Sequence, residues 1–448
     1  MLRLTEQEAR DLLGRVLARS KADSCEAVLS GNSDGNIRYA RNTVTTAGVS
    51  ENMSLVVRSS YGKRSGTATI NEFDDASLER VVRRSEDLAS LAPEDDEFVP
   101  PLAGPQKYLP SHTWNDGTAA ITAGDRAAAA AASIELSADR GCVAAGFYND
   151  RAGFAALANS NGLFAYNPST SVDFSLTART EDALGSGYVR RDFNDVARLN
   201  TDEASEIAIE KAVASRNARA IEPGRYTVIL EPEASVGLLE NMMFNLGARN
   251  ADEGRSFMAK PGGGTRVGEQ LMDERVTVTS DPSNSEAPAS PWFSDGRPRE
   301  ITTWIENGVV KNLYYSRYWA QKHQVPALPA PLERTAQGTQ GNFMMAGGDA
   351  SLEDLIRDTK RGVLVTRTWY IRTVDPQTLL YTGLTRDGTF FIEDGSIKHA
   401  VKNFRFNESP IIMLNNVDEL GQPVRSRNYL IPPMRIRDFT FTSLSDAV

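Results

Sequence analysis

The four residues Ile221-Glu222-Pro223-Gly224 divide the chain into two stretches of different texture. Proline disfavours a helical conformation in the residue before it and glycine permits the turn that follows, so the helix predicted over Thr201–Ala220 must end here. Helix-like and strand-like segments alternate before this point, and strand-like segments dominate after it. The sequence therefore predicts an α/β (α+β) fold, with a mixed α/β N-terminal domain over residues 1–220 and a mainly antiparallel β C-terminal domain over residues 221–448.

Three further segments of the N-terminal half carry signals for helices. Thr5 and Glu8 have the spacing of a capping box, and the apolar residues after them recur at helical spacing. A second helix is predicted from about Asp75. The run of alanines over Ala127–Ala132 favours a third helix, which we expect to be tightly packed rather than disordered.

Between Glu26 and Ile70 the sequence predicts strands separated by turns. Runs of β-prone residues alternate with Gly, Asn and Asp, and the sequence Gly31-Asn32-Ser33-Asp34-Gly35 is typical of a turn. Residues 91–118 are rich in Pro, Asp and Glu, which predicts a long surface connection.

Two hairpins are predicted in the C-terminal half. Asn307-Gly308 and Asp394-Gly395 each stand between strand-like runs, and such pairs supply the positive φ angles of a type I′ turn. Residues 281–298 predict a long exposed loop, and Ser351–Lys360 predicts a short helix.

The chain has few of the residues that commonly bind metals. It contains three histidines, His112, His323 and His399, and two cysteines, Cys25 and Cys142. A zinc site usually takes three or four ligands from His, Cys and carboxylates, so a Cys-rich zinc module, an iron–sulfur centre and a disulfide framework are excluded. We expect both cysteines to be buried apolar residues, His112 and His399 to be surface or structural histidines, and His323 to have a packing role.

The net charge of −10 argues against nucleic-acid binding, because phosphate backbones repel an acidic chain. No apolar run approaches the roughly 18 residues that span a bilayer. The first residues also lack the layout of a signal peptide. We therefore expect a cytoplasmic protein without membrane contact.

Common catalytic motifs do not occur in the sequence. Pro261–Arg266 is glycine-rich but lacks the Gly-Lys-Ser/Thr ending of a phosphate-binding loop, which favours a simple turn. There is also no Gly-x-Ser-x-Gly nucleophile elbow. Glu231 and Glu233 precede a predicted helix, where acidic residues ordinarily interact with the helix dipole.

The most informative segment is Tyr226–Asn245. It predicts a buried strand that ends at Pro232, followed at once by a helix whose apolar residues recur at helical spacing. The residues expected to face the core are Val236, Leu239, Met243 and Leu246. A helix that starts at a strand end holds its side chains rigidly, which makes it a good platform for a site.

This segment resembles the hallmark region of the TldD/TldE (PmbA) family, whose proteins were first described as modulators of DNA gyrase. Shorter resemblances follow in the family's order along most of the chain: Gly66–Asn71, Ser256–Met258, Arg266–Gln270, Asp273–Val278, Ser316–Tyr318, Gly341–Phe343 and Ile392–Gly395. In catalytic, TldD-type members the helix reads Leu-Leu-His-Glu-x-x-x-His. The resemblance implies that these residues bind a catalytic metal and supply the acid/base glutamate of a metalloprotease.

The chain departs from that motif at all three chemical positions. Reading across from Leu238-Leu239, the first histidine position is Glu240, the glutamate position is Asn241 and the second histidine position is Asn245. The family's cysteine ligand near the C-terminus is also missing, because both cysteines lie before residue 143. The resemblance therefore implies the metal-free TldE (PmbA) type, with no catalytic residue, no metal and no other cofactor on this chain.

Our leading hypothesis is a non-catalytic subunit that pairs with a TldD-type chain in a heterodimeric protease and helps to admit unfolded or extended peptides. Such a peptide could add to a sheet edge through backbone hydrogen bonds. Two alternatives stay open. The chain could be a hydrolase with an altered site, using the carboxylates of Glu231, Glu233 and Glu240 and a polar contact from Asn245. It could also be a stand-alone regulatory protein that forms a homodimer and contacts a protein partner.

Overall fold

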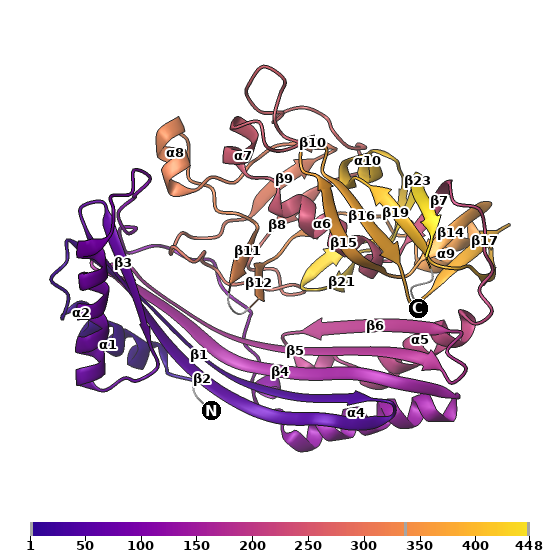
Figure 1. Cartoon of the computed structure of the whole chain (residues 1–448), viewed down its shortest axis with the longest axis horizontal. Helices are drawn as coiled ribbons and strands as arrows, with labels where there is room; N and C mark the ends of the chain where they lie inside the picture. Colours follow the sequence, from indigo (N-terminus) through magenta and orange to yellow (C-terminus); the bar gives the residue numbers. More distant parts are fainter. Residues whose placement is uncertain (1–2, 336–337, 446–448) are drawn as a thin grey trace.

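The computed structural model describes residues 3–335 and 338–445. The N-terminal half is built on one long, curved sheet, and the C-terminal half lies across one face of that sheet (Figure 1). Within the described residues, no helix has the length and the apolar content needed to cross a bilayer.

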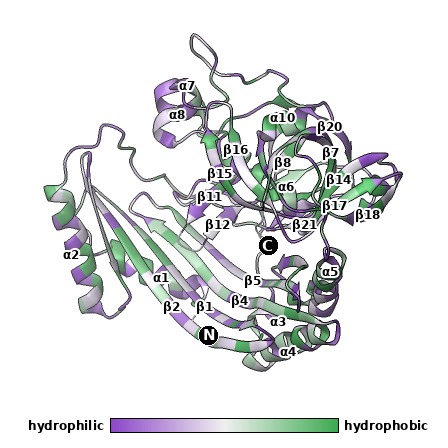
Figure 2. Ribbon diagram, turned by 45° about the vertical axis from the view of Figure 1, so that its right-hand side comes forward, coloured by the Kyte–Doolittle hydropathy of each residue, from purple (hydrophilic) through white to green (hydrophobic). Residues whose placement is uncertain are grey.

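The N-terminal sheet has the strand order β3-β2-β1-β4-β5-β6, and all neighbouring pairs are antiparallel. Its strands are β1 (Ser24–Ala40), β2 (Thr43–Tyr61), β3 (Arg64–Ile70), β4 (Cys142–Asn159), β5 (Phe164–Thr180) and β6 (Ser186–Phe193). Apolar and polar residues are interspersed along these strands (Figure 2). Buried and less buried residues alternate along β5 and much of β1, as expected when the two faces of a sheet have different surroundings.

Helices cover one face of this sheet towards its two ends. They are α1 (Glu6–Leu17), α2 (Asp75–Leu91), α3 (Asp116–Ala119), α4 (Ala123–Asp139) and α5 (Thr201–Ala214), with a 3-10 helix at Val196–Arg198. Helices α1 and α2 pack on a core that includes Leu29, and α4 and α5 pack on a core that includes Ile37. Both cores lie on the same face of β1, because these two residues are an even number of positions apart. The opposite face is left for the C-terminal half.

The predicted helices of the N-terminal half are present. The Thr5 side chain accepts a hydrogen bond from the backbone N–H of Glu8, and the Glu8 carboxylate accepts one from the N–H of Thr5, which completes the predicted capping box. Helix α4 packs through a narrower stripe than expected, since Ala127, Ala128 and Ala131 are exposed. Helix α5 ends at Ala214, before the predicted Ala220.

The turn predicted at Gly31–Gly35 is wrong, because these residues lie in the middle of β1 and pair with strands on both sides. The glycines permit close packing instead. A Cβ on Gly35 would lie 2.1 Å from a guanidinium nitrogen of Arg126, which donates to Asp150 at 2.6 Å. Local sequence does not distinguish a glycine needed for a turn from one needed for space.

The C-terminal half contains a large sheet with the strand order β15-β16-β19-β23-β7-β14-β17-β18, and β20 also pairs with β23. The strands are β7 (Arg225–Leu230), β14 (Arg361–Val365), β15 (Thr368–Asp375), β16 (Leu380–Thr385), β17 (Thr389–Glu393), β18 (Ser396–Ala400), β19 (Phe404–Glu408), β20 (Val417–Leu420) and β23 (Met434–Leu444). Strands β7 and β14 are parallel, and the other neighbouring strands of this sheet pair in antiparallel fashion. The predicted class, with a mainly antiparallel C-terminal half, is confirmed.

A second sheet and a two-stranded ribbon lie beside the large sheet. The second sheet comprises β8 (Val278–Ser280), β9 (Thr302–Glu306), β10 (Val309–Val310), β13 (Met344–Met345), β21 (Val424–Ser426) and β22 (Tyr429–Ile431), and the ribbon comprises β11 (Leu332–Thr335) and β12 (Gly338–Gly341). The helices are α6 (Pro232–Phe244), α7 (Ala248–Asp252), α8 (Arg317–His323), α9 (Leu352–Arg357) and α10 (Pro410–Asn415). One continuous apolar core joins the sheets around α6.

Both predicted hairpins are confirmed. Asn307 and Gly308 connect β9 to β10 with φ angles of 49° and 78°, and Asp394 and Gly395 connect β17 to β18 with 48° and 71°. The predicted helix at Ser351–Lys360 is α9, which Ser351 caps.

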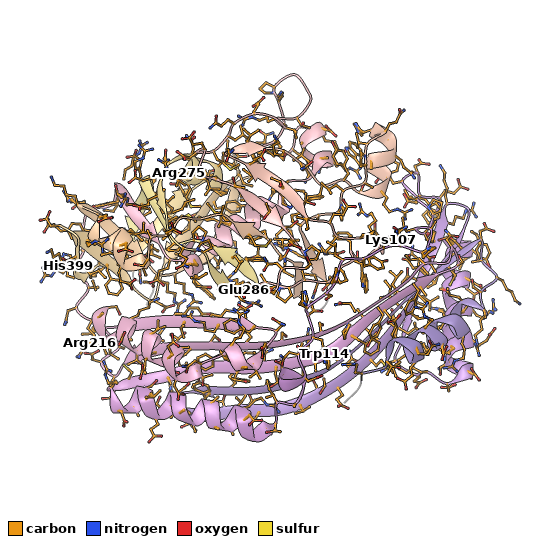
Figure 3. All side chains as sticks on the ribbon, turned by 180° about the vertical axis from the view of Figure 1, so that it is seen from behind. Lys107, Trp114, Arg216, Arg275, Glu286 and His399 are labelled. Atoms are coloured by element: carbon orange, nitrogen blue, oxygen red, sulfur yellow. The ribbon has the colours of Figure 1, made fainter. Side chains whose placement is uncertain are left out.

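Residues 281–298 form a loop, as predicted, but much of it is buried rather than exposed. Its Trp292 packs with Leu157 and Leu163 on the inner face of the N-terminal sheet, and Glu286 lies where the two halves meet (Figure 3). Polar composition alone does not reveal that a loop is buried between two halves of a molecule.

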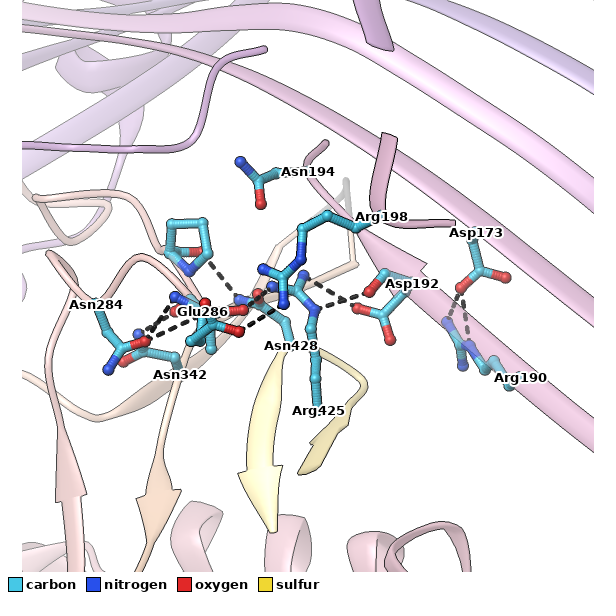
Figure 4. Close-up of polar contacts among 12 residues, drawn as sticks. Asp173, Arg190, Asp192, Asn194, Arg198, Asn284, Glu286, Asn342, Arg425 and Asn428 are labelled. Atoms are coloured by element: carbon cyan, nitrogen blue, oxygen red, sulfur yellow. Dashed lines mark hydrogen bonds and ion pairs between the residues drawn. The ribbon is translucent and has the colours of Figure 1, made fainter. Parts of the chain in front are cut away.

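Charged residues at the end of β6 and in the 3-10 helix that follows it bind the C-terminal half at this junction (Figure 4). Arg425 of β21 lies 3.3 Å from Asp192, and Arg198 lies 2.5 Å from Glu286 of the loop. These ion pairs connect the N-terminal sheet to the part of the C-terminal half that surrounds α6.

Candidate functional site

The strand and helix predicted at Tyr226–Asn245 are present as β7 and α6. Strand β7 lies inside the large sheet between β23 and β14, and its last three residues are buried. Pro232 starts α6, where its missing N–H removes no helical hydrogen bond. The apolar residues predicted to face the core are all buried: Val236, Leu239, Met243 and Leu246. The remaining side of α6 is thereby fixed in position.

Glu240 lies on that remaining side, among polar groups. The hydroxyls of Tyr429 and Thr339 each donate to its Oε1 at 3.3 Å, and the Arg427 guanidinium lies 3.7 Å from its Oε2. Burial, together with the charge of Glu240, raises the pKa of Tyr429 well above its ordinary value. The phenol therefore keeps its proton and acts as a donor to the carboxylate.

The amides of Asn241 and Asn245 bond to their own helix. Nδ2 of Asn241 donates to the carbonyl of Gly237 at 2.7 Å, and Nδ2 of Asn245 donates to the carbonyl of Asn241 at 2.8 Å. Asn245 also lies 3.5 Å from the hydroxyl of Tyr381. Both side chains thus extend the hydrogen bonding of the last turns of α6.

A cleft of about 290 Å³ opens beside Glu240. Its lining comes from α6, β11, β15 and the turn between β21 and β22. The lining residues are Gly237, Glu240, Asn241, Arg334, Thr368, Trp369, Tyr370, Ile371, Arg372 and Arg427. The structure therefore places two of the three predicted positions, Glu240 and Asn241, on this cleft, and Asn245 behind them.

Two residues of the lining adopt left-handed backbone conformations that side chains rarely favour. Arg427 has φ 50° and Tyr370 has φ 56°. Such strain costs about 1–3 kcal/mol per residue and persists where the surroundings impose it, often at ligand-binding positions. At Arg427 the strained turn places the guanidinium between Glu233, at 2.8 Å, and Glu240.

The other carboxylates considered from the sequence are already paired. Glu231 accepts from Nζ of Lys211 at 2.6 Å, which connects α6 to α5. Glu233 accepts from Arg427 and, at 3.1 Å, from the hydroxyl of Ser426. Glu233 and Glu240 thus share one arginine, whereas Glu231 points to a different element.

The histidines and cysteines lie apart from the cleft. The ring of His323 lies tilted against that of Trp319 with centroids 4.9 Å apart, His399 stacks on Phe391 at 5.4 Å, and His112 is exposed. Cys25 and Cys142 are buried and unpaired, and burial raises the pKa of both thiols. The predicted apolar role of the cysteines is confirmed. The glycine-rich Pro261–Arg266 is a turn with positive φ at three glycines, also as predicted.

The residues beside Glu240 do not fit the metal that the resemblance implies for catalytic members. A catalytic zinc takes three protein ligands, usually histidines and carboxylates. Here the three motif positions supply one carboxylate and two amides, both amides donate to the backbone of α6, and a guanidinium lies 3.7 Å from the carboxylate. Across residues 3–335 and 338–445, no group of three or more His, Cys, Asp or Glu side chains is arranged to hold a metal ion.

Sequence reasoning missed most of the cleft. Arg334, Thr339, Arg427 and Tyr429 are distant from α6 along the chain, and the fold brings them to Glu240. The segment Trp369–Arg372, in which aromatic and charged residues crowd together, was the one available signal. It lies in a strand whose position beside α6 depends on the sheet order.

Models of the PmbA/TldA metallopeptidase family match the chain in three parts. The first domain matches residues 25–89, the central domain matches residues 118–216 and the C-terminal domain matches residues 223–443. Together the three matches cover most of the chain, including β7, α6 and the cleft.

One curated relative is a metalloprotease from Methanothermobacter thermautotrophicus. It is 26% identical over 297 residues, which make up 62% of this chain and 62% of that protein. The match thus spans less than two thirds of the relative's length.

Several solved structures share the fold. TldE from Thermococcus kodakarensis matches with a TM-score of 0.86 at 18% identity, over 98% of this chain and 99% of that one. A proposed DNA gyrase modulator from Thermotoga maritima matches with a TM-score of 0.85 at 19% identity, over 98% and 100% of the chains. Another, from Bacteroides thetaiotaomicron, matches with 0.83 at 20%, over 98% and 99%.

Proposed function

The chain belongs to the PmbA/TldA metallopeptidase family, and from this membership we propose that it is the non-catalytic, TldE-like subunit of a two-subunit metalloprotease complex. Its partner is a TldD-type subunit that carries the catalytic metal. The substrates of the complex are unfolded or extended peptides.

The observation that carries the proposal is the set of groups around α6. Glu240 is held by Tyr429, Thr339 and Arg427, and Asn241 donates its amide hydrogen to the helix backbone. An amide cannot accept a proton from an attacking water, and the carboxylate of Glu240 is already engaged by two hydroxyls and a guanidinium. Glu231 is likewise paired with Lys211, and Glu233 with Arg427. These pairs argue against an altered hydrolase that uses the carboxylates of Glu231, Glu233 and Glu240.

The free edge of the large sheet supports peptide capture. Strand β15 is the terminal strand of that sheet, and it pairs with β16 on one side. Its residues Trp369, Tyr370 and Val374 expose 44%, 57% and 53% of their surfaces, which is unusual for large apolar residues. An extended peptide that adds to this edge would form backbone hydrogen bonds next to the cleft.

A second edge supports pairing with another subunit. The first half of β2, over residues 43–54, pairs with β1, whereas β3 pairs with β2 only from Leu55 onwards. Residues 43–52 are exposed and include a single charged residue, Glu51. Proteins usually protect a long edge strand with lysines, prolines or a covering element. An edge with none of these residues is suited to burial against a partner.

Co-purification with the TldD-type subunit of the same organism tests the proposal. We expect a stable one-to-one complex in which metal analysis finds zinc on the partner and none in stoichiometric amount on the isolated chain. A chain that forms only a homodimer, binds its own equivalent of zinc and hydrolyses peptides alone would contradict it.

A further inference from the structure

The cleft beside α6 has a positive lining in an acidic protein. Three of its lining residues are arginines, Arg334, Arg372 and Arg427, and Glu240 is the one acidic residue among them. The chain as a whole carries a net charge of −10. Arg427 pairs with Glu233 at 2.8 Å and lies 3.7 Å from Glu240, so three guanidinium groups meet two carboxylates and one net positive charge remains there.

Two of these arginines have their guanidinium groups available. In the described part of the chain, Arg334 and Arg372 make no ion pair. Arg334 lies over the ring of Phe244 at 4.7 Å, and Arg372 lies over the ring of Tyr370 at 4.4 Å and donates to the neighbouring carbonyl of Ile371 at 3.2 Å. The aromatic contacts orient the two groups without neutralising them.

Arg427 adds an unsatisfied donor. Its terminal nitrogens face Glu233 and Glu240, but among the residues that the structure describes its buried Nε has no hydrogen-bond partner. A buried N–H without a partner costs about 1–3 kcal/mol, so such a group is expected to have a partner in the functional state. The two residues with left-handed backbone conformations, Arg427 and Tyr370, both line this cleft, Arg427 from the turn between β21 and β22 and Tyr370 from β15.

We infer that this cleft binds the carboxylate of an extended peptide, which Arg334, Arg372 and Arg427 hold while the peptide backbone lies along the free edge of β15. The inference rests on the proposed function, because it names the feature of the peptide that this subunit recognises. Guanidinium groups match the planar, two-oxygen geometry of a carboxylate. The exposed Trp369 and Tyr370 on the same wall supply apolar contact for the residue that carries it.

The carboxylate has two sources, the C-terminus of the peptide or an Asp or Glu side chain. The test measures binding of a fluorescent hexapeptide without acidic side chains to the full-length chain by anisotropy, once as the free acid and once as the C-terminal amide. We expect the amide to bind at least tenfold more weakly. A third peptide is amidated at its C-terminus and carries one internal Glu. If this peptide regains affinity, the site binds side-chain carboxylates; if it does not, the site binds the C-terminal carboxylate.

Arginine variants distinguish binding by the cleft from a general effect of the protein's charge on peptide binding. Arg334→Gln and Arg372→Gln should each weaken binding of the free acid several-fold and leave the amide unchanged. Arg275→Gln is the matched control, because Arg275 is an exposed arginine of the same half that pairs with Asp273 outside the cleft. Its substitution should leave both affinities unchanged.

Three results would overturn the inference. They are equal binding of acid and amide, no binding of either, and stronger competition by inorganic phosphate than by acetate at equal ionic strength. Any of these three results would leave the proposed function intact, provided that the chain still forms a complex with its TldD-type partner. Loss of that complex, with the difference between acid and amide preserved, would instead contradict the proposed function and keep the carboxylate site.

Discussion

Arg427 is the residue on which the charges of the site depend. It neutralises Glu233 and lies close to Glu240. Its backbone is left-handed, a conformation that costs a non-glycine residue conformational free energy. Burial alone would lower its pKa, but the charge of Glu233, with that of Glu240, keeps the pKa above its ordinary value.

Substitution Arg427→Gln should therefore destabilise the protein, because it leaves two carboxylates without a cation. We expect a loss of about 2 kcal/mol, less than the 3–5 kcal/mol of a fully buried pair since these groups keep some solvent contact. Chemical denaturation monitored by circular dichroism measures the loss. Glu240→Gln keeps an oxygen that accepts from Tyr429 and should cost less than about 1 kcal/mol. Equal effects of the two changes would show that Arg427 has no special role.

Glu408 gives a pH dependence that runs opposite to that of paired carboxylates. Burial raises its pKa above the ordinary 4.5, although it accepts from the N–H groups of Ser409 and Thr440. The folded protein thus keeps this proton to a higher pH than the unfolded chain. The contribution of Glu408 to the free energy of unfolding therefore falls as pH rises from 4.5 through the raised value.

The Glu408→Gln variant should lack this decline. Between pH 7 and pH 5, wild type should gain stability relative to the variant, as measured by paired thermal melts at each pH. A constant difference across this range would mean that the pKa of Glu408 is not raised.

At the scale of elements, the sequence was informative where a local rule decides the structure. Pro232 starts α6, Asn307-Gly308 forces a hairpin, and Thr5 with Glu8 begins α1, each through its own backbone geometry. The prediction of a turn at Gly31–Gly35 was wrong because these residues pair with β2 on one side and β4 on the other, and distant strands decide that pairing. For the same reason α6 could be predicted from the sequence, whereas Arg334 and Arg427, which complete its cleft, could not.

The open edge of β2 makes a prediction at this scale. Val49 is 60% exposed on that edge, and a lysine there opposes strand addition because its charge would lose water on pairing. We expect Val49→Lys to weaken association with a TldD-type subunit by about tenfold, equivalent to 1.4 kcal/mol. Analytical ultracentrifugation over a concentration series measures this change.

A matched control places the lysine on a different exposed strand. Val424 of β21 is 48% exposed, and Val424→Lys should leave association unchanged. If both variants bind the partner like wild type, the partner contacts another surface.

At the scale of the whole molecule, the two halves are joined by buried and exposed ion pairs that can be compared directly. The side chains of Arg425 and Asp192 are 8% and 16% exposed, whereas those of Arg198 and Glu286 are 34% and 56% exposed. Burial lowers the pKa of Arg425, and the charge of Asp192 opposes that shift. The junction also positions the turn that carries Arg427, two residues further along the chain.

Asp192→Asn should cost about 2–3 kcal/mol, because it leaves a buried guanidinium with carbonyl partners only. Glu286→Gln should cost less than about 1 kcal/mol, as is usual for an exposed pair. Hydrogen exchange should also speed up in residues 281–298 of the first variant and not of the second. Similar exchange in both would mean that the buried pair does not hold the halves together.

The most direct test of the account is a titration. The rate of peptide hydrolysis by a fixed amount of the TldD-type subunit is measured while this chain is added. The account predicts no hydrolysis by this chain alone and a rate that rises with addition until the two subunits are equimolar, then stays constant. A rate that does not change on addition, or hydrolysis that scales with this chain in the absence of the partner, would contradict it.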